Sequence, residues 1–443
     1  MEKTDGMTDW RKIIISGIIW LLSAVEDHII GVSEWPYMST IDPKATTSFF
    51  GVATAMSHAG HAIGAMVFAL WRRRFKTAKH EVFPENRRYL MMVCYFLFGL
   101  GLGSMSVIRS YIADVSTEGD RSRAYAVTNC AGLMAIVLGP VIQLAFSAKT
   151  FEYPGHNIIG HKILFNFYTA PIYFATGMNI IAILATLFFF VDVRKEQLPT
   201  ISPVGSFWEQ IQLLLKRSGV VWPIVLLCLF QIVSTRITSI TVGTVTAPLF
   251  MSGYGWDGHK TVMVMAIGQA VVGIICVAIA ALFVFARLGQ RIHARITFMF
   301  GLVITVGLYI ITYPWPKITV PVAVWNETSG LGCNPKEYGW CDGHVTQPAI
   351  WITLLVLVMG AGLPFLMISL DTIYSKVLGS GDQSMLQGVN MLVEDLTLVI
   401  GAIYSTAIFT KSGQGILWIV NGSITFIAAA LWIASYRALA PYR

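Results

Sequence analysis

The chain has 443 residues, of which 55% are hydrophobic and only 12% are charged. Soluble proteins carry about 25% charged residues, so this composition excludes a soluble protein and indicates one that lies in a lipid bilayer. The formal net charge of +7 does not indicate nucleic-acid binding, because the Lys and Arg residues lie in short loops between apolar runs, where the positive-inside rule places them.

Apolar runs recur along the chain, each long enough for an α-helix to cross about 30 Å of hydrocarbon. They predict an all-α polytopic membrane protein with eleven spans and no soluble domain of useful size. The predicted spans cover residues 13–38, 46–71, 89–113, 124–147, 166–192, 220–250, 261–286, 295–313, 349–375, 387–410 and 414–437.

A polar segment at 193–219 divides the chain into two parts of similar size, 1–192 and 220–443. Transporters made of two repeated helix bundles are organised in this way. Basic residues stand near both ends of the segment, so it is predicted to be a cytosolic linker between an N-terminal and a C-terminal bundle.

The longest loop of the second part, 314–348, is then expected to face the lumen or the exterior. It contains the sequon "NET" at Asn326 and the pair Cys333 and Cys341. Glycosylation and disulfide formation both belong to oxidising compartments. We therefore predict a glycan on Asn326 and a disulfide between the two cysteines.

The first part breaks the charge pattern. The basic segments 72–88 and 116–123 should both be cytosolic, yet only one predicted span separates them. An odd number of spans cannot join two loops on the same side. Either the positive-inside rule fails here, or a helix is missing between Trp71 and Tyr89.

Several motifs are similar to those of one transporter family. A basic loop, "WRRRFK" or "ARLGQR", follows the second span of each part, and "LGPVIQ" carries a Gly-Pro pair in the fifth-helix region. Three longer stretches are "WPYMSTIDPKATTSFFG", "GLGLGSMSVIRSYIA" and "GLPFLMISLDTIYSKVLG". The chain resembles the major facilitator superfamily, and within it the lysosomal, ceroid-lipofuscinosis-type branch. The resemblance implies two pseudo-symmetric helix bundles, transport of a small solute and a lysosomal or late endosomal membrane.

The sequence also departs from this family. There is no room for the third helix between Arg74 and Glu85, which accounts for the charge pattern, and a paralogue that lost the helix and a spliced or mispredicted product both explain the gap. Tyr95 stands where the family usually has an arginine, and "WRRRFK" lacks the expected acidic residue. These losses weaken the expectation of the family's usual proton coupling and gating.

Ionisable residues in the spans are the candidate pathway residues, because a charged group in the membrane costs at least about 2.5 kcal/mol on insertion scales. The first span holds Glu26, Asp27 and His28 in a row. At 100° per residue, Asp27 shares one polar face with Glu34, so Asp27 is the first candidate for proton exchange in the central cavity. Glu26 and His28 project about 100° to either side, where a pathway role and helix-packing hydrogen bonds are both open.

The candidate basic residues are Arg236 and Arg109, and the other acidic ones are Asp371, Glu394 and Asp395. A buried guanidinium must be paired or must bind an anion. One hypothesis is a structural ion pair of Arg236 with Glu394 or Asp395. The other is an anion site at the midplane between the bundles.

The sequence contains no P-loop and no motif of a soluble enzyme, so we predict neither an enzyme nor a bound cofactor or metal. The expected partners are the lipid bilayer and a small solute or ion. The leading hypothesis is secondary active transport in the endolysosomal membrane, with an anionic solute and proton coupling among the options. A chloride-channel-like conductance and a non-transporting facilitator that acts in membrane interaction or sensing are the alternatives.

Overall fold

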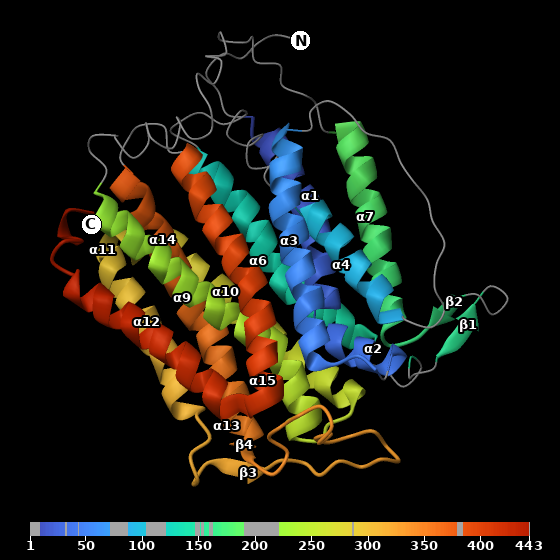
Figure 1. The fold of residues 1–443 in the computed structure, drawn as a ribbon. Helices are drawn as coiled ribbons and strands as arrows, with labels where there is room; N and C mark the ends of the chain where they lie inside the picture. The colour runs from blue at the N-terminus through green and yellow to red at the C-terminus, as the bar shows by residue number, and fades with distance from the viewer. Residues whose placement is uncertain are drawn as a thin grey trace.

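The structure is a computed structural model, and helices make up most of the part it describes (Figure 1). That part consists of residues 9–31, 33–42, 44–70, 87–102, 121–146, 151, 155–158, 163–189, 221–285, 288–378 and 384–442. The candidate Arg109, the central segment 193–219 and residues 71–86, where the sequence predicts that a helix is missing, lie outside it.

Two groups of helices precede and follow the central segment, and we call them the N-terminal and the C-terminal helices. The N-terminal helices are α1 (Trp10–Ile30), α2 (Glu34–Ile41), α3 (Thr47–Leu70), α4 (Arg87–Leu102), α6 (Arg121–Ala145) and α7 (Thr169–Phe189). The C-terminal helices are α9 (Trp222–Pro248), α10 (Gly258–Phe285), α11 (Leu288–Arg291), α12 (Ala294–Ile311), α13 (Pro348–Leu357), α14 (Leu363–Leu378) and α15 (Ser384–Ala434).

The first predicted span is not one helix, and this prediction was wrong. The chain leaves the helical conformation after Ile30 and starts α2 at Glu34. Gly31 follows the end of α1, and Pro36 lies in the first turn of α2, where a missing backbone N–H costs nothing. The helical phase therefore does not continue from Asp27 to Glu34, and these two residues share no continuous helix face.

The last two predicted spans form the single element α15, which is interrupted at Gly413 with φ +72°. Its two legs run in opposite directions along α9. In the first leg, Ser405 bonds to Thr241 of α9, at 2.7 Å between the hydroxyl oxygens. In the second leg, the Asn421 amide also donates to Thr241, at 2.9 Å, and the Ala428 carbonyl accepts from Gln231, at 2.7 Å. The two legs therefore hold α9 between them.

Two elements contain a π-helical turn: η2 (Leu249–Gly253), which continues α9, and η3 (Val358–Gly362), which joins α13 to α14. Glycines allow close packing at the second turn. A Cβ added to Gly360 would lie 3.1 Å from Ile275 of α10. Turns of this kind are frequent at functional sites.

The sequence did not predict the two short antiparallel strand pairs. One joins β1 (His156–Ile158) to β2 (Ile163–Phe165), and the other joins β3 (Thr319–Pro321) to β4 (His344–Thr346). Both pairs lie at the lower end of the molecule in Figure 1. We call this end, which carries residues 312–347, the loop end.

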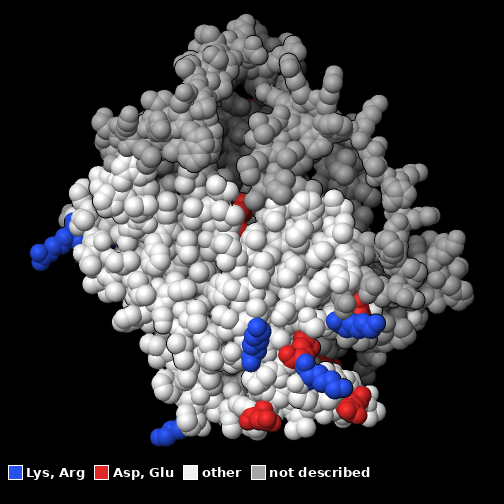
Figure 2. Space-filling view, viewed as in Figure 1, with Lys and Arg blue, Asp and Glu red and all other residues white. Residues whose placement is uncertain are grey.

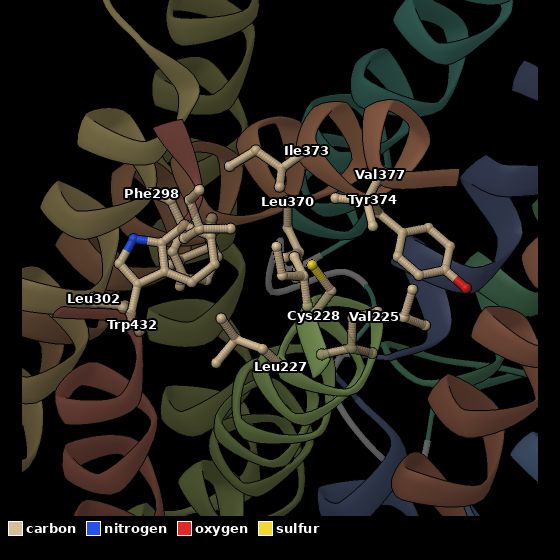
Figure 3. Close-up of a cluster of buried hydrophobic side chains, with 14 of the residues drawn as sticks. Val225, Leu227, Cys228, Phe298, Leu302, Leu370, Ile373, Tyr374, Val377 and Trp432 are labelled. Atoms are coloured by element: carbon tan, nitrogen blue, oxygen red, sulfur yellow. The ribbon is translucent and has the colours of Figure 1, made fainter. Parts of the chain in front are cut away.

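The helices have the composition of membrane spans. Six of them, within the described residues, are long and apolar enough to cross a bilayer. Figure 2 shows that most charged side chains on this face gather near the loop end, below a broad uncharged band. The core of the C-terminal helices includes Phe298 and Trp432, whose ring centroids lie 4.1 Å apart (Figure 3).

Candidate functional site

The candidate site is the interface between the N-terminal and the C-terminal helices, which is closed at the loop end. α3 packs against α15, and α6 packs against α10. A Cβ added to Gly273 of α10 would lie 2.7 Å from Val137 of α6, so the helices approach closely there. Aromatic side chains continue the seal: Trp35 packs in one cluster with Ala247, and Tyr168 in another with Val262.

A polar contact also joins the two groups of helices at the loop end. The backbone N–H of Thr47, the first residue of α3, donates to Oε1 of Glu337 in the large loop, at 2.8 Å. The Thr47 hydroxyl bonds to the Tyr338 hydroxyl at 2.5 Å. At the next residue of α3, the Ser48 hydroxyl donates to Thr410 of α15, at 3.1 Å. We call the contact of Thr47 with Glu337 and Tyr338 the loop latch.

The loop latch changes the acidity of its members. Burial raises the pKa of Glu337, although hydrogen bonds from Thr47 and Tyr338 oppose the change. Burial also raises the pKa of Tyr338, with a further contribution from the Glu337 carboxylate. A charged carboxylate is therefore disfavoured in the closed arrangement.

A disulfide between Cys333 and Cys341 encloses the latch residues in a short ring, with 5.4 Å between the two Cα atoms. The same ring is anchored to α15 by Trp340. A Cβ added to Gly413 would lie 2.7 Å from Cγ of Trp340, and the Trp340 and Phe409 ring centroids lie 5.0 Å apart. The loop is thus held in place by covalent and packing contacts together.

Asn326 lies in the same loop with an exposed side chain. Its amide oxygen accepts the backbone N–H groups of Thr328 and Ser329, at 2.9 and 3.2 Å. The sequon therefore forms a turn at the surface. Glycosylation of Asn326 stays a prediction.

Arg236 of α9 forms an ion pair with Glu394 of α15. The two side chains are 24% and 28% exposed, whereas the adjacent Asp395 is 7% exposed. Of the two hypotheses for Arg236, a structural ion pair and an anion site, this contact is the structural ion pair. The charge of Arg236 is therefore balanced by the protein itself.

The other candidates are spread over several elements. The side chains of Glu26 and Asp27 on α1 lie outside the described part. His28 is half-buried, and its backbone packs against Gly139 of α6. Asp371 has an exposed side chain on α14. The structure thus joins Arg236 to Glu394 but does not gather all candidates in one place.

Some interface residues were not selected from the sequence as site residues. Tyr95 is buried, and the Glu34 carboxylate interacts with its hydroxyl. Trp35 has a buried indole N–H for which the described residues offer no acceptor. His58 lies half-buried in the middle of α3. The sequence shows that His58 is titratable. It shows neither how deeply the side chain is buried nor which helix lies opposite it.

Within the described residues, His, Cys, Asp and Glu side chains form no group of three or more that suits a metal ion. The interface is instead made of hydroxyl groups, aromatic rings and a few charged side chains. Such a surface can hold a polar solute through hydrogen bonds, and it can move protons between titratable groups.

Comparisons with known proteins identify the fold and the family. The chain is 25% identical to the major facilitator superfamily domain-containing protein 8 of Xenopus laevis, over 98% of this chain and 92% of the relative. That match spans 486 positions, whereas this chain has 443 residues, so at least 43 positions of the relative have no counterpart here. This difference is long enough for a membrane helix of about 20 residues.

Solved transporters share the architecture. A D-xylose-proton symporter superposes with a TM-score of 0.60 at 12% identity, covering 96% of this chain and 97% of the symporter. A bacterial homologue of the human lysosomal transporter Spinster, inward-facing and unoccupied, gives 0.56 at 13% identity and 98% of both chains. Residues 55–333 match the family described as Major Facilitator Superfamily. The two groups of helices close against each other at one end, and the family match covers more than half of the sequence. Together, these findings show that the chain belongs to the major facilitator superfamily.

Proposed function

We propose that the protein is a secondary active transporter that moves a small polar solute, coupled to protons, across an endolysosomal membrane. Membership of a transporter superfamily supports the general activity. The observation that carries the proposal is the closed loop end, in which a latch and two aromatic clusters join the N-terminal to the C-terminal helices. Alternating access requires a closure of this kind on one side of the membrane.

Proton coupling is supported by titratable groups at or near the interface. Glu337 lies in the latch, and Glu394 lies in the membrane-spanning part of α15, paired with Arg236. Asp27 stays a candidate on the sequence argument alone. Since Arg236 already has an acidic partner, we give an anionic solute less weight than a neutral or zwitterionic one.

The proposed location follows from the loop and from the resemblance to the lysosomal branch. The disulfide and the surface-exposed sequon at Asn326 share one loop, and both modifications belong to oxidising compartments. We therefore orient the loop end towards the lumen. Microscopy with a lysosomal membrane marker tests the compartment, and glycosidase treatment of wild type and Asn326→Gln tests the orientation. A mobility shift that is equal in both proteins would reject glycosylation of Asn326.

The transport experiment uses purified protein in vesicles that contain a pH-sensitive dye. Panels of sugars, nucleosides, amino acids and small organic anions are added outside, with and without an imposed pH gradient. A solute that changes internal pH only in the presence of protein supports coupled transport.

Two other results would replace the proposal. Chloride conductance without any solute-linked proton movement would indicate a channel. If the folded protein shows neither solute flux nor conductance, the non-transporting alternative takes its place, and the 43 or more missing positions would be its natural explanation.

A further inference from the structure

A groove on the outer surface of the C-terminal helices lies between α12 and the second leg of α15, which follows Gly413. A Cβ added to Gly415 would lie 3.6 Å from Pro314 near the loop end, and one added to Gly422 would lie 3.2 Å from Tyr309 further from that end. The two segments therefore run side by side in opposite directions. Figure 1 shows them on the side of the C-terminal helices that faces away from the N-terminal helices.

The groove has a volume of about 670 Å³, within the range of sites that enclose a small organic molecule. Its floor is low because Gly422 and Ser423 carry small side chains. Its walls are apolar side chains, among which Ile310 is 57% exposed and Phe426 is 65% exposed. Both segments are long and apolar enough to cross a bilayer, so the ligand of the groove must come from the lipid phase.

Buried hydrogen bonds fix the floor of the groove. The Trp418 indole N–H donates to the Thr312 hydroxyl, at 2.7 Å. The Tyr309 hydroxyl donates to Thr238 of α9, at 3.0 Å, and the Tyr309 and Trp418 rings meet edge to face with their centroids 5.6 Å apart. An ordered floor of this kind favours a rigid ligand, which gives up little conformational freedom when it binds.

The loop end of the groove is aromatic and polar. The Trp315 indole N–H donates to the Ile310 carbonyl, at 2.7 Å, and the Tyr313 ring lies edge-on to Trp315 at 5.0 Å between centroids. Side chains of these types are typical of the membrane–water interface. The Tyr313 hydroxyl forms no hydrogen bond with the described part of the chain, whereas the Ser423 hydroxyl is already bonded to the Ile419 carbonyl, at 2.7 Å. The groove therefore has an apolar body and a polar end at Tyr313.

The length of the groove limits the ligand further. The wall from α15 extends from Trp418 to Ile427, which is about 14 Å of helix rise. This is less than half of the roughly 30 Å of hydrocarbon in a bilayer. The ligand therefore lies within one leaflet, with its polar group at the membrane surface.

The sequence at this end also carries a pattern associated with cholesterol. The pattern is a Leu or Val, a Tyr and a Lys or Arg, with one to five residues between each pair. Leu308, Tyr313 and Lys317 match it. Leu308 is buried behind the floor, Tyr313 lines the groove, and Lys317 is exposed just beyond it. The tyrosine of the pattern thus coincides with the polar end of the groove.

We propose that this groove binds a sterol, with the ring system on the floor at Tyr309 and Gly422 and the sterol hydroxyl at Tyr313. A sterol is flat, rigid and apolar, and its single hydroxyl lies at the membrane surface. A phospholipid acyl chain would lose the freedom of many rotatable bonds on the same floor, and it has no hydroxyl for Tyr313. The site belongs to the C-terminal helices alone and does not depend on the proposed transport.

Photolabelling tests the site in the full-length protein. The protein is placed in phosphatidylcholine vesicles with a cholesterol analogue that carries a diazirine and an alkyne, and the labelled peptides are identified by mass spectrometry. Adducts should lie within residues 306–315 and 418–427, and excess cholesterol should suppress them. A phosphatidylcholine with a diazirine in its acyl chain is the comparison probe. The proposal is overturned if that probe labels the groove and excess cholesterol does not displace it, or if the sterol probe labels other segments instead.

Two tryptophan variants test whether the groove itself holds the sterol. Ser423→Trp fills the groove from an exposed position and should abolish labelling. Ile311→Trp is the matched control, because Ile311 is 48% exposed and lies about 100° around α12 from Ile310, outside the groove. It should label as wild type does. Equal labelling of the two variants, each purified as monodisperse protein, would reject the groove.

Tyr313→Phe tests the polar end and removes only one oxygen atom, so the fold should be kept. The loss of one neutral hydrogen bond should raise the probe fraction that gives half-maximal labelling about fivefold. Tyr254→Phe, at a hydroxyl that bonds to the Thr346 carbonyl in the loop, is the control and should leave this fraction unchanged. If Tyr313→Phe also leaves it unchanged, the hydroxyl contact is absent and the proposal of a sterol fails.

Discussion

The backbone N–H of Thr47 and the carboxylate of Glu337 are 290 positions apart in sequence and form a hydrogen bond of 2.8 Å. The contact ties the first turn of α3 to a loop between two C-terminal helices. The Glu337 oxygen accepts from a backbone N–H at the start of the helix, a donor that has no partner within the helix itself. Opening of the loop end must break this contact.

Glu337→Ala should therefore favour the open loop end. A helix cap of this kind contributes about 1 kcal/mol, which corresponds to roughly a fivefold change in the open population. The measurement is the labelling rate of Ala45→Cys, whose native side chain is 7% exposed, by a membrane-impermeant thiol reagent in a Cys94→Ser background. Glu337→Gln keeps an acceptor oxygen and should label near the unaltered rate. Faster labelling in both variants, or in neither, would contradict the capping role.

The latch should also respond to pH. Burial raises the pKa of Glu337 in the closed arrangement, so the closed form binds a proton more tightly than the open one. By linkage, the closed form is most strongly favoured at pH values below the ordinary carboxyl pKa. This advantage is lost as the pH rises through the raised pKa that Glu337 has in the closed form. Three lysines near Glu337 in sequence or space have exposed side chains: Lys44, Lys336 and Lys411. The titratable residue that bonds to the Glu337 carboxyl is Tyr338.

The test is again the labelling of Ala45→Cys, followed from acidic to neutral pH and corrected for the reagent's own pH dependence. Labelling should become faster as pH rises, and Glu337→Gln should remove this change. Acceleration towards acidic pH would show that the linkage has the opposite sign.

Removal of the Cys333–Cys341 disulfide should loosen the latch, since the ring carries Glu337 and Tyr338. A disulfide typically contributes about 2–4 kcal/mol, chiefly by restricting the flexible state. Cys333→Ser with Cys341→Ser should lower the melting temperature and increase labelling at Ala45→Cys. Cys94→Ser, at an exposed free thiol, should leave the melting temperature unchanged. If the double variant is stable and labels slowly, the packing of Trp340 alone is sufficient to hold the loop latch closed.

Gly413→Ala should destabilise the turn between the two legs of α15. Gly413 has φ +72°, which costs other residues roughly 1 kcal/mol or more, and a Cβ would also lie 2.7 Å from Trp340. Gly415→Ala is the matched control, because its nearest neighbour would be 3.6 Å away. Thermal unfolding in detergent should separate the two, and equal melting temperatures would show that the turn adapts.

Glu394→Gln should strand the positive charge of Arg236. Breaking a buried ion pair costs about 3–5 kcal/mol, and partial exposure of both side chains reduces that figure. We expect less folded protein for Glu394→Gln and for Arg236→Gln, and partial recovery in the double variant. The amount of monodisperse protein after purification measures this. A double variant that is worse than either single one would refute the pairing as a source of stability.

The spans could be predicted from hydropathy, because length and apolar composition alone decide whether a helix can cross the bilayer. The break between α1 and α2 was missed, although Gly31 and Pro36 marked it, because the apolar run continues across them. Arg236 had two adjacent acidic candidates, and helical direction separates such neighbours by about 100°. Only the placement of α15 against α9 selected Glu394.

Contacts between distant segments were beyond the sequence. Nothing near Glu337 in the chain indicates that its partner is the backbone of Thr47, because a backbone N–H has no sequence signature. His58 was visible as an ionisable residue in a span, but its significance depends on which helix faces it.

The grip of the two α15 legs on α9 has a mechanical consequence. Gln231 and Thr241 of α9 are bonded to the second leg, and Thr241 also to the first, so these three segments cannot slide past one another without losing several buried hydrogen bonds. They should rotate together as one rigid body. The sliding surface then lies where the packing is made of small side chains, at Gly51 and Ala55 of α3 and at Gly273 of α10, and a bulky residue there should freeze the molecule in one state.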